Sequence, residues 1–318
     1  REEKTNSRLS RSSIKMKLYI QKTSVQGAWK WINEGYRKAW LDAGFDVHEY
    51  TDILQIDTSE EFNLMAWEYD IRNRDAAIEV ISKANKAFIF VQPNTFPEPW
   101  GRHPNWVSGV SDGHINTINT FEHVKLWTMC DNNDNLYHKW KQVTTVPLAF
   151  DSLTYLPENN EKYSQYDISF VGGWANNGYN EKKEIMIKTF SSFIKSNLKC
   201  GFFINKGLTN QQECDLLHNS RLTLNVHDAY QRTLGLDTNE RTFKSLGLNG
   251  LLITDTVGQL NNLFPNTRTS LSPEELVQIT KEYLSLSEKE LADIKEQNRQ
   301  NIQDNHTYIK RVEELMKL

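Results

Sequence analysis

Apolar and polar residues alternate in short blocks along the first half of the chain, in the order expected of successive strands and helices. Residues 16–21 (MKLYIQ) form a short apolar run. Residues 27–44 then carry Trp31, Gly35, Ala39 and Trp40 at helical spacing, and residues 45–50 alternate between apolar and polar. Trp31, Trp40 and Trp67 are predicted to be core residues. Because parallel strands need a crossover connection, this strand–helix–strand unit predicts a parallel sheet.

The same alternation continues to about residue 150. Residues 60–84 have a helical pattern with a charged face and predict one helix. The run 86–92 (KAFIFVQ) is continuously apolar, as expected for a strand that is buried on both faces. Two long stretches, residues 93–106 and 108–119, predict loops, and loops of this length in a compact domain are usually functional. Further strands are predicted at residues 124–129 and 143–148.

A second series of strands and helices begins after a polar, turn-rich stretch at residues 151–166, which we interpret as a linker. The predicted strands are residues 167–172, 201–205, 222–227 and 251–254, and the predicted helices are residues 181–197, 210–218 and 239–248. We therefore predict an α/β fold of two Rossmann-like domains, residues 16–150 and 167–300, whose parallel sheets face a cleft. A last helix, residues 301–318, is expected to pack back toward the first domain.

Length, composition and charge narrow the class of protein. A chain of 318 residues exceeds the size at which single hydrophobic cores stop growing, which favours two domains. Hydrophobic residues make up 38% and charged residues 25% of the chain, so a packed globular protein is expected. The formal net charge of −4 argues against bulk nucleic-acid binding, which needs a basic surface.

Cysteine usage and the ends of the chain suggest a cytoplasmic protein. The chain has three cysteines, Cys130, Cys200 and Cys214. Because their number is odd and their spacing is wide, a disulfide framework or a zinc site is not expected. No apolar run approaches the roughly 20 residues of a membrane helix, and no secretory signal is visible. Residues 1–15 are polar and basic, which predicts a disordered tail, with Met16 as a plausible natural start.

The strongest candidate site lies between residues 222 and 255. A predicted strand ends near His227 and Asp228, and a polar loop leads to a helix that starts near Asn239. Arg241 falls in the first turn of that helix, where free backbone N–H groups and the positive end of the helix dipole favour an anion. An arginine fork at this place suits a diphosphate. From spacing alone, an ordinary helix with a surface arginine is the alternative.

This segment resembles the C-terminal domain of group 1 glycosyltransferases, in the spore-maturation-protein (CgeB-like) branch of the GT-B fold. That branch shows an Arg-x-Phe-Glu-x-x-x-x-Gly run followed by an apolar strand and Thr-Asp, and the segment from Arg241 to Asp255 (RTFKSLGLNGLLITD) is similar. Further stretches resemble the branch in order and spacing across roughly the second half of the chain: residues 146–151 (VPLAFD), residues 167–173 (DISFVGG) and residues 305–308 (NHTY) with Arg311.

The resemblance implies a metal-independent, hexosyltransferase-like enzyme that moves a sugar from a UDP- or GDP-linked donor to an acceptor hydroxyl, with no required cofactor. Residues 16–150 would form the acceptor-side domain and residues 167–300 the nucleotide-sugar-binding domain. Glycines after a strand let the backbone approach a ligand closely, although a plain turn is an equal alternative for the Gly-Gly pair. The candidate donor-binding residues are Gly172, Gly173, Lys206, His227, Asp228, Glu240, Arg241, Thr242 and Lys244.

One position departs from the branch. The resemblance implies an acid after the phenylalanine, where it would bind the ribose hydroxyls, but this chain has Lys244. A cation cannot accept those hydrogen bonds. Three interpretations stay open: Glu240 substitutes from the previous turn, Lys244 turns to the phosphates, or the donor site is altered.

Candidates for the acceptor side come from the two long loops. Asp112 or His114 is a candidate general base on the acceptor hydroxyl, with a structural role as the alternative. Trp29, Trp100 and Trp106 lie in loop-like contexts and are candidates for stacking on a sugar.

No metal site is expected, because residues 131–135 (DNNDN) lack the glycine and distal glutamate of a calcium loop and predict a surface turn. The predicted partners are a nucleotide sugar and a glycan, small-molecule or other hydroxyl acceptor. Two alternatives remain: a glycosyltransferase that acts on a modified nucleic-acid base, which the negative charge disfavours, and a catalytically dead nucleotide-sugar-binding protein, which Lys244 suggests.

Overall fold

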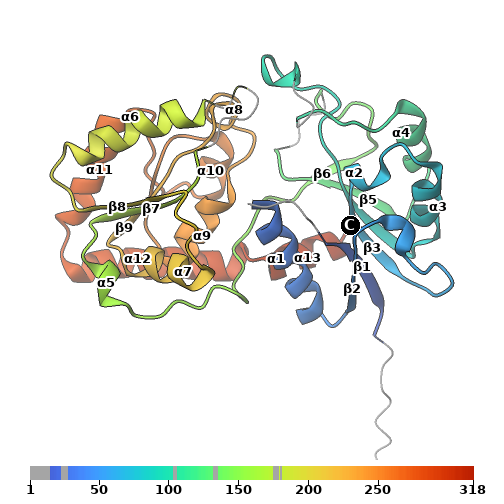
Figure 1. Ribbon diagram of the computed structural model, residues 1–318, viewed down its shortest axis with the longest axis horizontal. Helices are drawn as coiled ribbons and strands as arrows, with labels where there is room; N and C mark the ends of the chain where they lie inside the picture. Colours follow the sequence, from blue (N-terminus) through green and yellow to red (C-terminus); the bar gives the residue numbers. More distant parts are fainter. Residues whose placement is uncertain (1–14, 23–27, 103–105, 132–134, 175–178, 180) are drawn as a thin grey trace, which may run out of the picture.

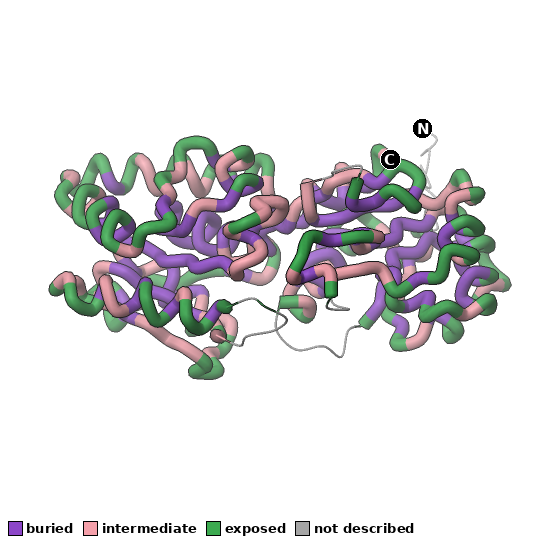
Figure 2. The backbone as a smooth tube through the Cα atoms, turned by 90° about the horizontal axis from the view of Figure 1, so that it is seen from above, coloured by how far each residue is buried: buried purple, intermediate pink, exposed green. Residues whose placement is uncertain are grey.

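The computed structural model has two lobes, one for each predicted α/β domain (Figure 1). The structure describes residues 15–22, 28–102, 106–131, 135–174, 179 and 181–318. Buried segments are concentrated in each lobe (Figure 2), and one hydrophobic cluster continues from one face of the N-terminal sheet to one face of the C-terminal sheet. The fold class is therefore confirmed, while the predicted tail lies almost entirely outside the described residues.

The N-terminal lobe is built on a parallel six-stranded sheet in the order β2-β1-β3-β4-β5-β6. The strands are β1 (Lys17–Gln21), β2 (Asp46–Tyr50), β3 (Asn63–Trp67), β4 (Lys86–Phe90), β5 (Val124–Thr128) and β6 (Val143–Thr145). Helices α1 (Ala28–Asp42) and α13 (Tyr308–Met316) cover one face. Helices α2 (Glu68–Ile71), α3 (Asp75–Lys83) and α4 (Asp112–Ile118) cover the other, and the short helices η1 (Ile53–Gln55) and η2 (Trp100–Arg102) lie in its connections.

Residues 60–84 do not form the single helix that their pattern predicted. They form β3, α2 and α3 in succession. All five residues of β3 are buried, because the strand lies in the sheet between β1 and β4 with helices on both faces. A short apolar run buried on both sides loses the alternation that marks a strand, so its periodicity cannot separate it from a helix.

The second predicted loop, residues 108–119, is also partly helical. Ser111 caps α4, and its side chain accepts a hydrogen bond from the backbone N–H of His114. Asp112 and His114 therefore lie in the first turn of a helix and not in a loop.

The C-terminal lobe has a parallel four-stranded sheet in the order β10-β9-β7-β8. Its strands are β7 (Ile168–Gly172), β8 (Cys200–Ile204), β9 (Leu222–Asn225) and β10 (Leu252–Thr254), which confirms the four predicted strands. Helices α6 (Lys182–Ile194) and α11 (Pro273–Leu284) cover one face. Helices α7 (Asn210–Asn219), α9 (Glu240–Leu248) and α12 (Glu288–Asn305) cover the other, and the shorter helices are α5 (Glu161–Ser164), α8 (Ala229–Leu234) and α10 (Gly258–Leu263).

The chain passes between the lobes twice, and the two passages lie side by side. Phe150 forms a parallel bridge with Thr307: its N–H donates to the carbonyl of His306 at 2.8 Å, and its carbonyl accepts from Tyr308 at 3.2 Å. After the second passage, α13 packs on α1, where a Cβ at Gly35 would overlap the ring of Tyr308. The final helix is thus part of the N-terminal lobe.

Candidate functional site

The topology of the C-terminal sheet marks one crevice. β7 comes first in the chain, β8 pairs with one of its edges, and β9 pairs with the other. The connections that leave the carboxyl ends of β7 and β9 therefore turn in opposite directions. In open α/β sheets, ligands bind at such a switch point.

Arg241 fills this switch point. It lies in the first turn of α9, whose N-cap Asn239 accepts from the backbone N–H of Thr242 at 3.3 Å. The Arg241 Nε donates to the carbonyl of Val171 in β7 at 2.7 Å, and its Nη1 donates to the Oδ1 of Asn225 in β9 at 3.1 Å. Burial lowers the pKa of Arg241, but an arginine remains charged in proteins. The predicted helix start is therefore confirmed, and the guanidinium bridges the two strands that define the crevice.

The glycine at the end of β7 permits this approach. A Cβ at Gly172 would overlap the Nη2 of Arg241, so a side chain at this position would displace the guanidinium. Gly173 follows and lies near the side chain of Asn205. Glycine is thus favoured at these two positions because neighbouring side chains pack against the backbone, which the Gly-Gly motif alone did not reveal.

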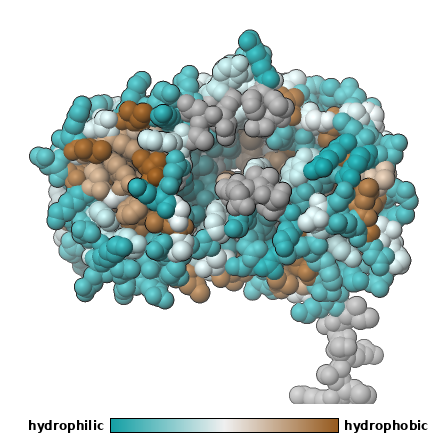
Figure 3. Space-filling view, in the orientation of Figure 1, coloured by the Kyte–Doolittle hydropathy of each residue, from teal (hydrophilic) through white to brown (hydrophobic). Residues whose placement is uncertain are grey.

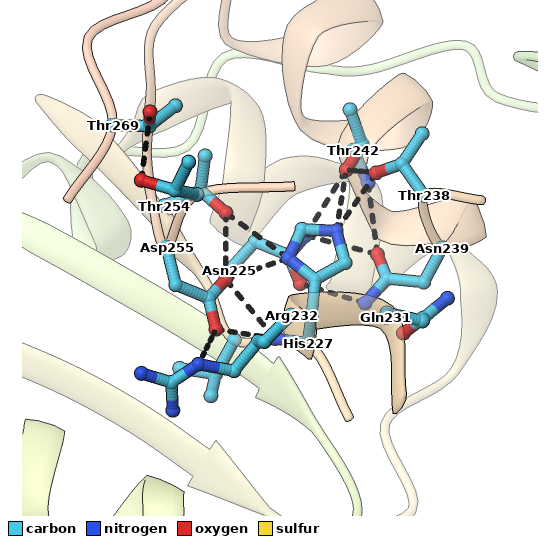
Figure 4. Close-up of polar contacts among 12 residues, drawn as sticks. Asn225, His227, Gln231, Arg232, Thr238, Asn239, Thr242, Thr254, Asp255 and Thr269 are labelled. Atoms are coloured by element: carbon cyan, nitrogen blue, oxygen red, sulfur yellow. Dashed lines mark hydrogen bonds and ion pairs between the residues drawn. The ribbon is translucent and has the colours of Figure 1, made fainter. Parts of the chain in front are cut away.

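His227 is the centre of a buried polar network at the ends of β9 and β10 (Figure 4). Its ring Nδ1 lies 2.6 Å from the Oδ1 of Asp255, and because a carboxylate only accepts, Nδ1 carries the proton. Its Nε2 lies 2.7 Å from the Oγ1 of Thr238. Burial acts to raise the pKa of Asp255, but the charge and hydrogen bond of His227 outweigh it, so this pKa lies below its usual range.

Two basic residues near this network were not predicted from the sequence. Lys182, at the start of α6, donates to the carbonyl of Val226 and forms an ion pair with Asp228 at 3.3 Å. Burial lowers the pKa of Lys182, and Asp228 offsets part of this effect. Arg232 lies 3.5 Å from the Oδ2 of Asp255. The signal that would have found Lys182 is a lysine at the start of the helix that follows the Gly-Gly loop.

Lys244 lies apart from the phosphate-binding candidates, between two acids. Its Nζ donates to the Oε1 of Glu213 in α7 at 2.7 Å and lies 3.1 Å from the Oε1 of Glu240. Its Nζ also lies 4.9 Å from the ring centre of Tyr155. Burial acts to lower the pKa of Lys244, but the two glutamates outweigh it and raise the pKa well above its usual range. Lys244 is therefore a buried cation held by a carboxylate pair.

The remaining sequence candidates are not gathered at this crevice. Lys206 is exposed in the loop after β8. Asp112 forms an ion pair with Lys139 at 2.8 Å, and the Nε2 of His114 lies 2.9 Å from Asp75. These contacts lie within the N-terminal lobe, where α4 packs on α3.

Trp29 and Trp31 both lie in α1 and have different surroundings. Trp29 packs edge-on against Trp67 and Phe90, with ring centres 5.0 and 5.6 Å away, so it belongs to an aromatic cluster. Trp40 is fully buried, as predicted. Trp31 is only half-buried, which corrects the prediction that it is a core residue.

Trp100 and Trp106 contact the other lobe. The indole N–H of Trp100 donates to the carbonyl of Tyr179 at 3.2 Å, and Trp106 packs edge-on against Tyr230 of α8 with ring centres 5.5 Å apart. Both tryptophans follow β4, and Tyr230 follows β9. The carboxyl ends of the two sheets therefore face each other, and the surface is hollowed between the lobes (Figure 3).

A set of hydrogen bonds around Gln259 joins the lobes at this facing edge; we call it the Gln259 latch. The fully buried Nε2 of Gln259 in α10 donates to the carbonyl of Met129 at 2.8 Å and to Asp131 at 3.1 Å, both just after β5. Its Oε1 accepts from the backbone N–H of Thr238 at 2.9 Å. The Asp131 N–H also donates to the carbonyl of Leu236 at 2.6 Å. Through Thr238, the latch connects the N-terminal lobe with the His227 network.

Three further expectations concern metals, cysteines and membranes. Within the described part of the chain, no three His, Cys, Asp or Glu residues are grouped to hold a metal ion, and the predicted turn at residues 131–135 lies partly outside that part. The three cysteines are free thiols. Among the helices that the structure describes, none combines the length and the apolar character needed to span a bilayer.

Two parallel sheets whose carboxyl edges face each other across the space between two lobes define the GT-B fold, the fold of a large class of glycosyltransferases. Residues 163–317 match the protein-family model described as "Glycosyl transferase-like". The matched residues include the whole C-terminal sheet, Arg241 and α13.

Solved structures with the same fold are distant in sequence. A mutant of S. aureus TarM in complex with fondaparinux, α-GlcNAc-glycerol and UDP aligns over 83% of this chain and 56% of its own, with 8% identity and a TM-score of 0.52. The apo structure of OtsA aligns over 92% of this chain and 79% of its own, with 9% identity and a TM-score of 0.54. A UDP-forming α,α-trehalose-phosphate synthase from Burkholderia xenovorans has the same coverage and identity, with a TM-score of 0.52.

The chain spans little more than half the length of some of these structures, as the TarM alignment shows. No curated protein sequence matches the chain. At identities near 9%, the similarity establishes the fold, and the activity has to be argued from the site.

Proposed function

We propose that the chain is a glycosyltransferase of the CgeB-like branch that moves a hexose from a nucleotide-diphosphate sugar to an acceptor hydroxyl. The observation that carries this proposal is Arg241, a half-buried guanidinium that bridges β7 and β9 at the switch point and lies at the N-terminus of α9. The match of residues 163–317 to a glycosyltransferase-like family model supports it. UDP is the nucleotide to test first, because it is named with two of the similar structures.

The chemistry needs the charge of the leaving diphosphate to be stabilised. Arg241 supplies a fixed positive fork, and the first backbone N–H groups of α9 add the positive end of the helix dipole. Lys182 and Arg232 add two cations near the same strand ends. Groups that are already oriented cost no reorganisation when charge develops, so this arrangement suits departure of a diphosphate without a metal.

The acid pair around Lys244 bears on the nucleotide. Of the three interpretations of Lys244, the contacts favour the first, in which an acid from elsewhere replaces the missing one. Glu240 and Glu213 both lie within reach of the Lys244 ammonium, and each carboxylate keeps acceptor capacity beyond that one ion pair. We assign ribose recognition to Glu240 with Glu213, and we assign to Lys244 the task of holding both acids.

Calorimetric titration of the full chain with UDP and GDP tests the proposal. Wild-type protein is expected to bind one of them, and Arg241→Ala is expected to weaken binding about 10–100-fold, since a hydrogen bond to a charged group contributes about 1.5–3 kcal/mol. Arg268→Ala is the matched control, because Arg268 is a half-exposed arginine paired with Glu282 at 2.6 Å in the same lobe. Failure of wild-type protein to bind either nucleotide would refute the proposal.

The catalytically dead protein remains the second candidate, because Lys244 replaces the expected acid. Hydrolysis or transfer of a UDP-linked or GDP-linked sugar separates the two. Turnover that Arg241→Ala abolishes excludes a dead protein, whereas nucleotide binding without turnover supports one. Asp112→Asn and His114→Ala, assayed in the same way, test whether either residue is the general base.

A further inference from the structure

The N-terminal sheet has its own switch point. β1 comes first in the chain, β2 pairs with one of its edges, and β3 pairs with the other. The rule that locates a ligand between the ends of β7 and β9 therefore marks a second crevice between the ends of β1 and β3. Gln21 is the last residue of β1, and its side chain is hydrogen-bonded to Tyr69 and Asp70 just after β3.

A cavity of about 170 Å³ opens next to this crevice, on the β2 side of Gln21, between the ends of β1 and β2 and helix α1. An apolar cavity of about 150 Å³ accommodates a benzene-sized molecule, so this volume fits one six-membered ring. Its described lining residues are Ile20, Gln21, Lys22, Lys30, Trp31, Asn33, Glu34, Arg37 and Glu49. The lining thus combines one large aromatic ring with amides and charged groups.

The aromatic residue of this cavity is the half-buried Trp31. Its ring centre lies 5.9 Å from the Nζ of Lys244, which is one turn along α9 from Arg241. Trp31 therefore lies between the cavity and the helix to which we assign the donor nucleotide. A ligand in the cavity would therefore lie beside the part of the proposed donor site to which Lys244 and Glu240 belong.

A buried amide in the cavity wall has an unused acceptor. Asn33 is 5% exposed, and its Nδ2 donates to the carbonyl of Gln21 at 3.1 Å. Its Oδ1 has no hydrogen-bond partner within the described part of the chain. Buried polar atoms are nearly always paired, so an unpaired acceptor in a cavity wall suggests a ligand donor such as a hydroxyl.

The charges of the lining do not cancel. The Nη2 of Arg37 pairs with Glu34 at 2.7 Å, which leaves Lys22 and Lys30 against Glu49 alone. Neither lysine has an ion-pair partner among the described residues. The cavity mouth therefore has one net positive charge, which favours an anionic ligand over a neutral one.

We propose that this cavity, lined by Trp31 and Asn33 and flanked by Lys22 and Lys30, is the acceptor subsite and takes a single hydroxylated ring that carries a carboxylate or a phosphate. Trp31 packs against the ring, Asn33 accepts from a hydroxyl, and the two lysines attract the anionic group. The role as acceptor subsite rests on the proposed function, whereas binding of such a ring can be measured on its own.

The test is titration of the full chain with glucose, glucuronate and glucose 6-phosphate, in low salt, followed by ligand-observed NMR. At least one anionic sugar is expected to bind with a Kd below about 10 mM and several-fold more tightly than glucose, since each exposed charge contributes up to about 1 kcal/mol. Trp31→Ala should weaken binding about tenfold or more. The two anionic sugars distinguish a carboxylate from a phosphate ligand.

A charge-reversal variant tests the cavity without disturbing the fold. Lys22 and Lys30 are exposed, so Lys22→Glu with Lys30→Glu should remove the preference for anionic sugars and leave the melting temperature unchanged. Lys188→Glu with Lys281→Glu is the matched control, with two exposed lysines of the other lobe, and should keep the preference. Anionic sugars that bind both double variants and wild type equally would place the site elsewhere and overturn the proposal.

The outcomes also separate this proposal from the proposed function. If UDP or GDP binds but none of the three sugars does, the acceptor cavity is wrong and the glycosyltransferase proposal stands. If an anionic sugar binds through Trp31 while neither nucleotide binds, the cavity stands as a sugar site and the glycosyltransferase proposal fails.

Discussion

The Gln259 latch gives the sharpest prediction about how the lobes are held. Gln259→Ala removes two hydrogen bonds across the lobe interface, to Met129 and Asp131, and one within the C-terminal lobe, to the N–H of Thr238. At a net contribution of about 1 kcal/mol for each bond, the interface loses about 2 kcal/mol, which changes the ratio of closed to open molecules about 30-fold. The backbone N–H of Thr238 is also left without its partner.

Small-angle scattering and amide hydrogen exchange together measure this effect. The variant is expected to have a larger radius of gyration than wild type and to lose exchange protection at the Thr238 amide. Gln278→Ala is the matched control, because Gln278 is an exposed glutamine of α11 whose bond to Glu282 stays within one helix. An unchanged radius of gyration, with unchanged exchange at Thr238, would show that the lobes are held by other contacts.

Three shorter predictions concern the C-terminal site. Gly172→Ala is expected to displace the Arg241 guanidinium and to weaken UDP binding about tenfold in calorimetry, with little loss of helical circular dichroism. His227 holds the pKa of Asp255 below its unfolded value, so this carboxylate contributes stability that is present above the unfolded pKa and is lost as the pH falls through the folded pKa. The Asp255→Asn variant should therefore melt at a lower temperature than wild type at neutral pH, and the two melting temperatures should converge in acid. Lys244→Met is expected to lower the melting temperature, because it leaves two partly buried carboxylates without their buried cation, at a cost below the roughly 3–5 kcal/mol of a fully buried pair.

The sequence predicted the C-terminal lobe well because its signals are local. The helix start at Asn239 and Arg241 needs only a capping residue and a dipole, and both are visible within a few residues. The strand before it is a short apolar run between polar loops, so its limits were predicted closely. Its place beside β7, which creates the switch point, depends on the order of strands and not on any single motif.

The features that the sequence did not reveal depend on distant partners. β3 was mistaken for part of a helix because its strand character comes from β1 and β4 on either side. Gln259 is one glutamine among many, and only the packing of α10 against the end of β5 gives it three partners. Trp31 was assigned to the core from helical spacing, but Trp31 and the buried Trp40 are separated by about two and a half turns of α1, so their side chains lie on opposite sides of the helix.

The same reasoning explains why Lys244 is consistent with a working donor site. A lysine in place of an acid removes one acceptor, but its ammonium draws in Glu213 from α7 and holds Glu240 from its own helix, so the local net charge of these three groups remains negative. The acids are therefore supplied by Glu240, one turn earlier in α9, and by Glu213 in the neighbouring helix α7. Lys244 occupies the position of the expected acid and holds these two carboxylates. This arrangement makes Glu213 and Glu240 interdependent. Glu213→Gln should therefore weaken nucleotide binding as Glu240→Gln does, whereas a site that uses Glu240 alone would not respond to Glu213→Gln.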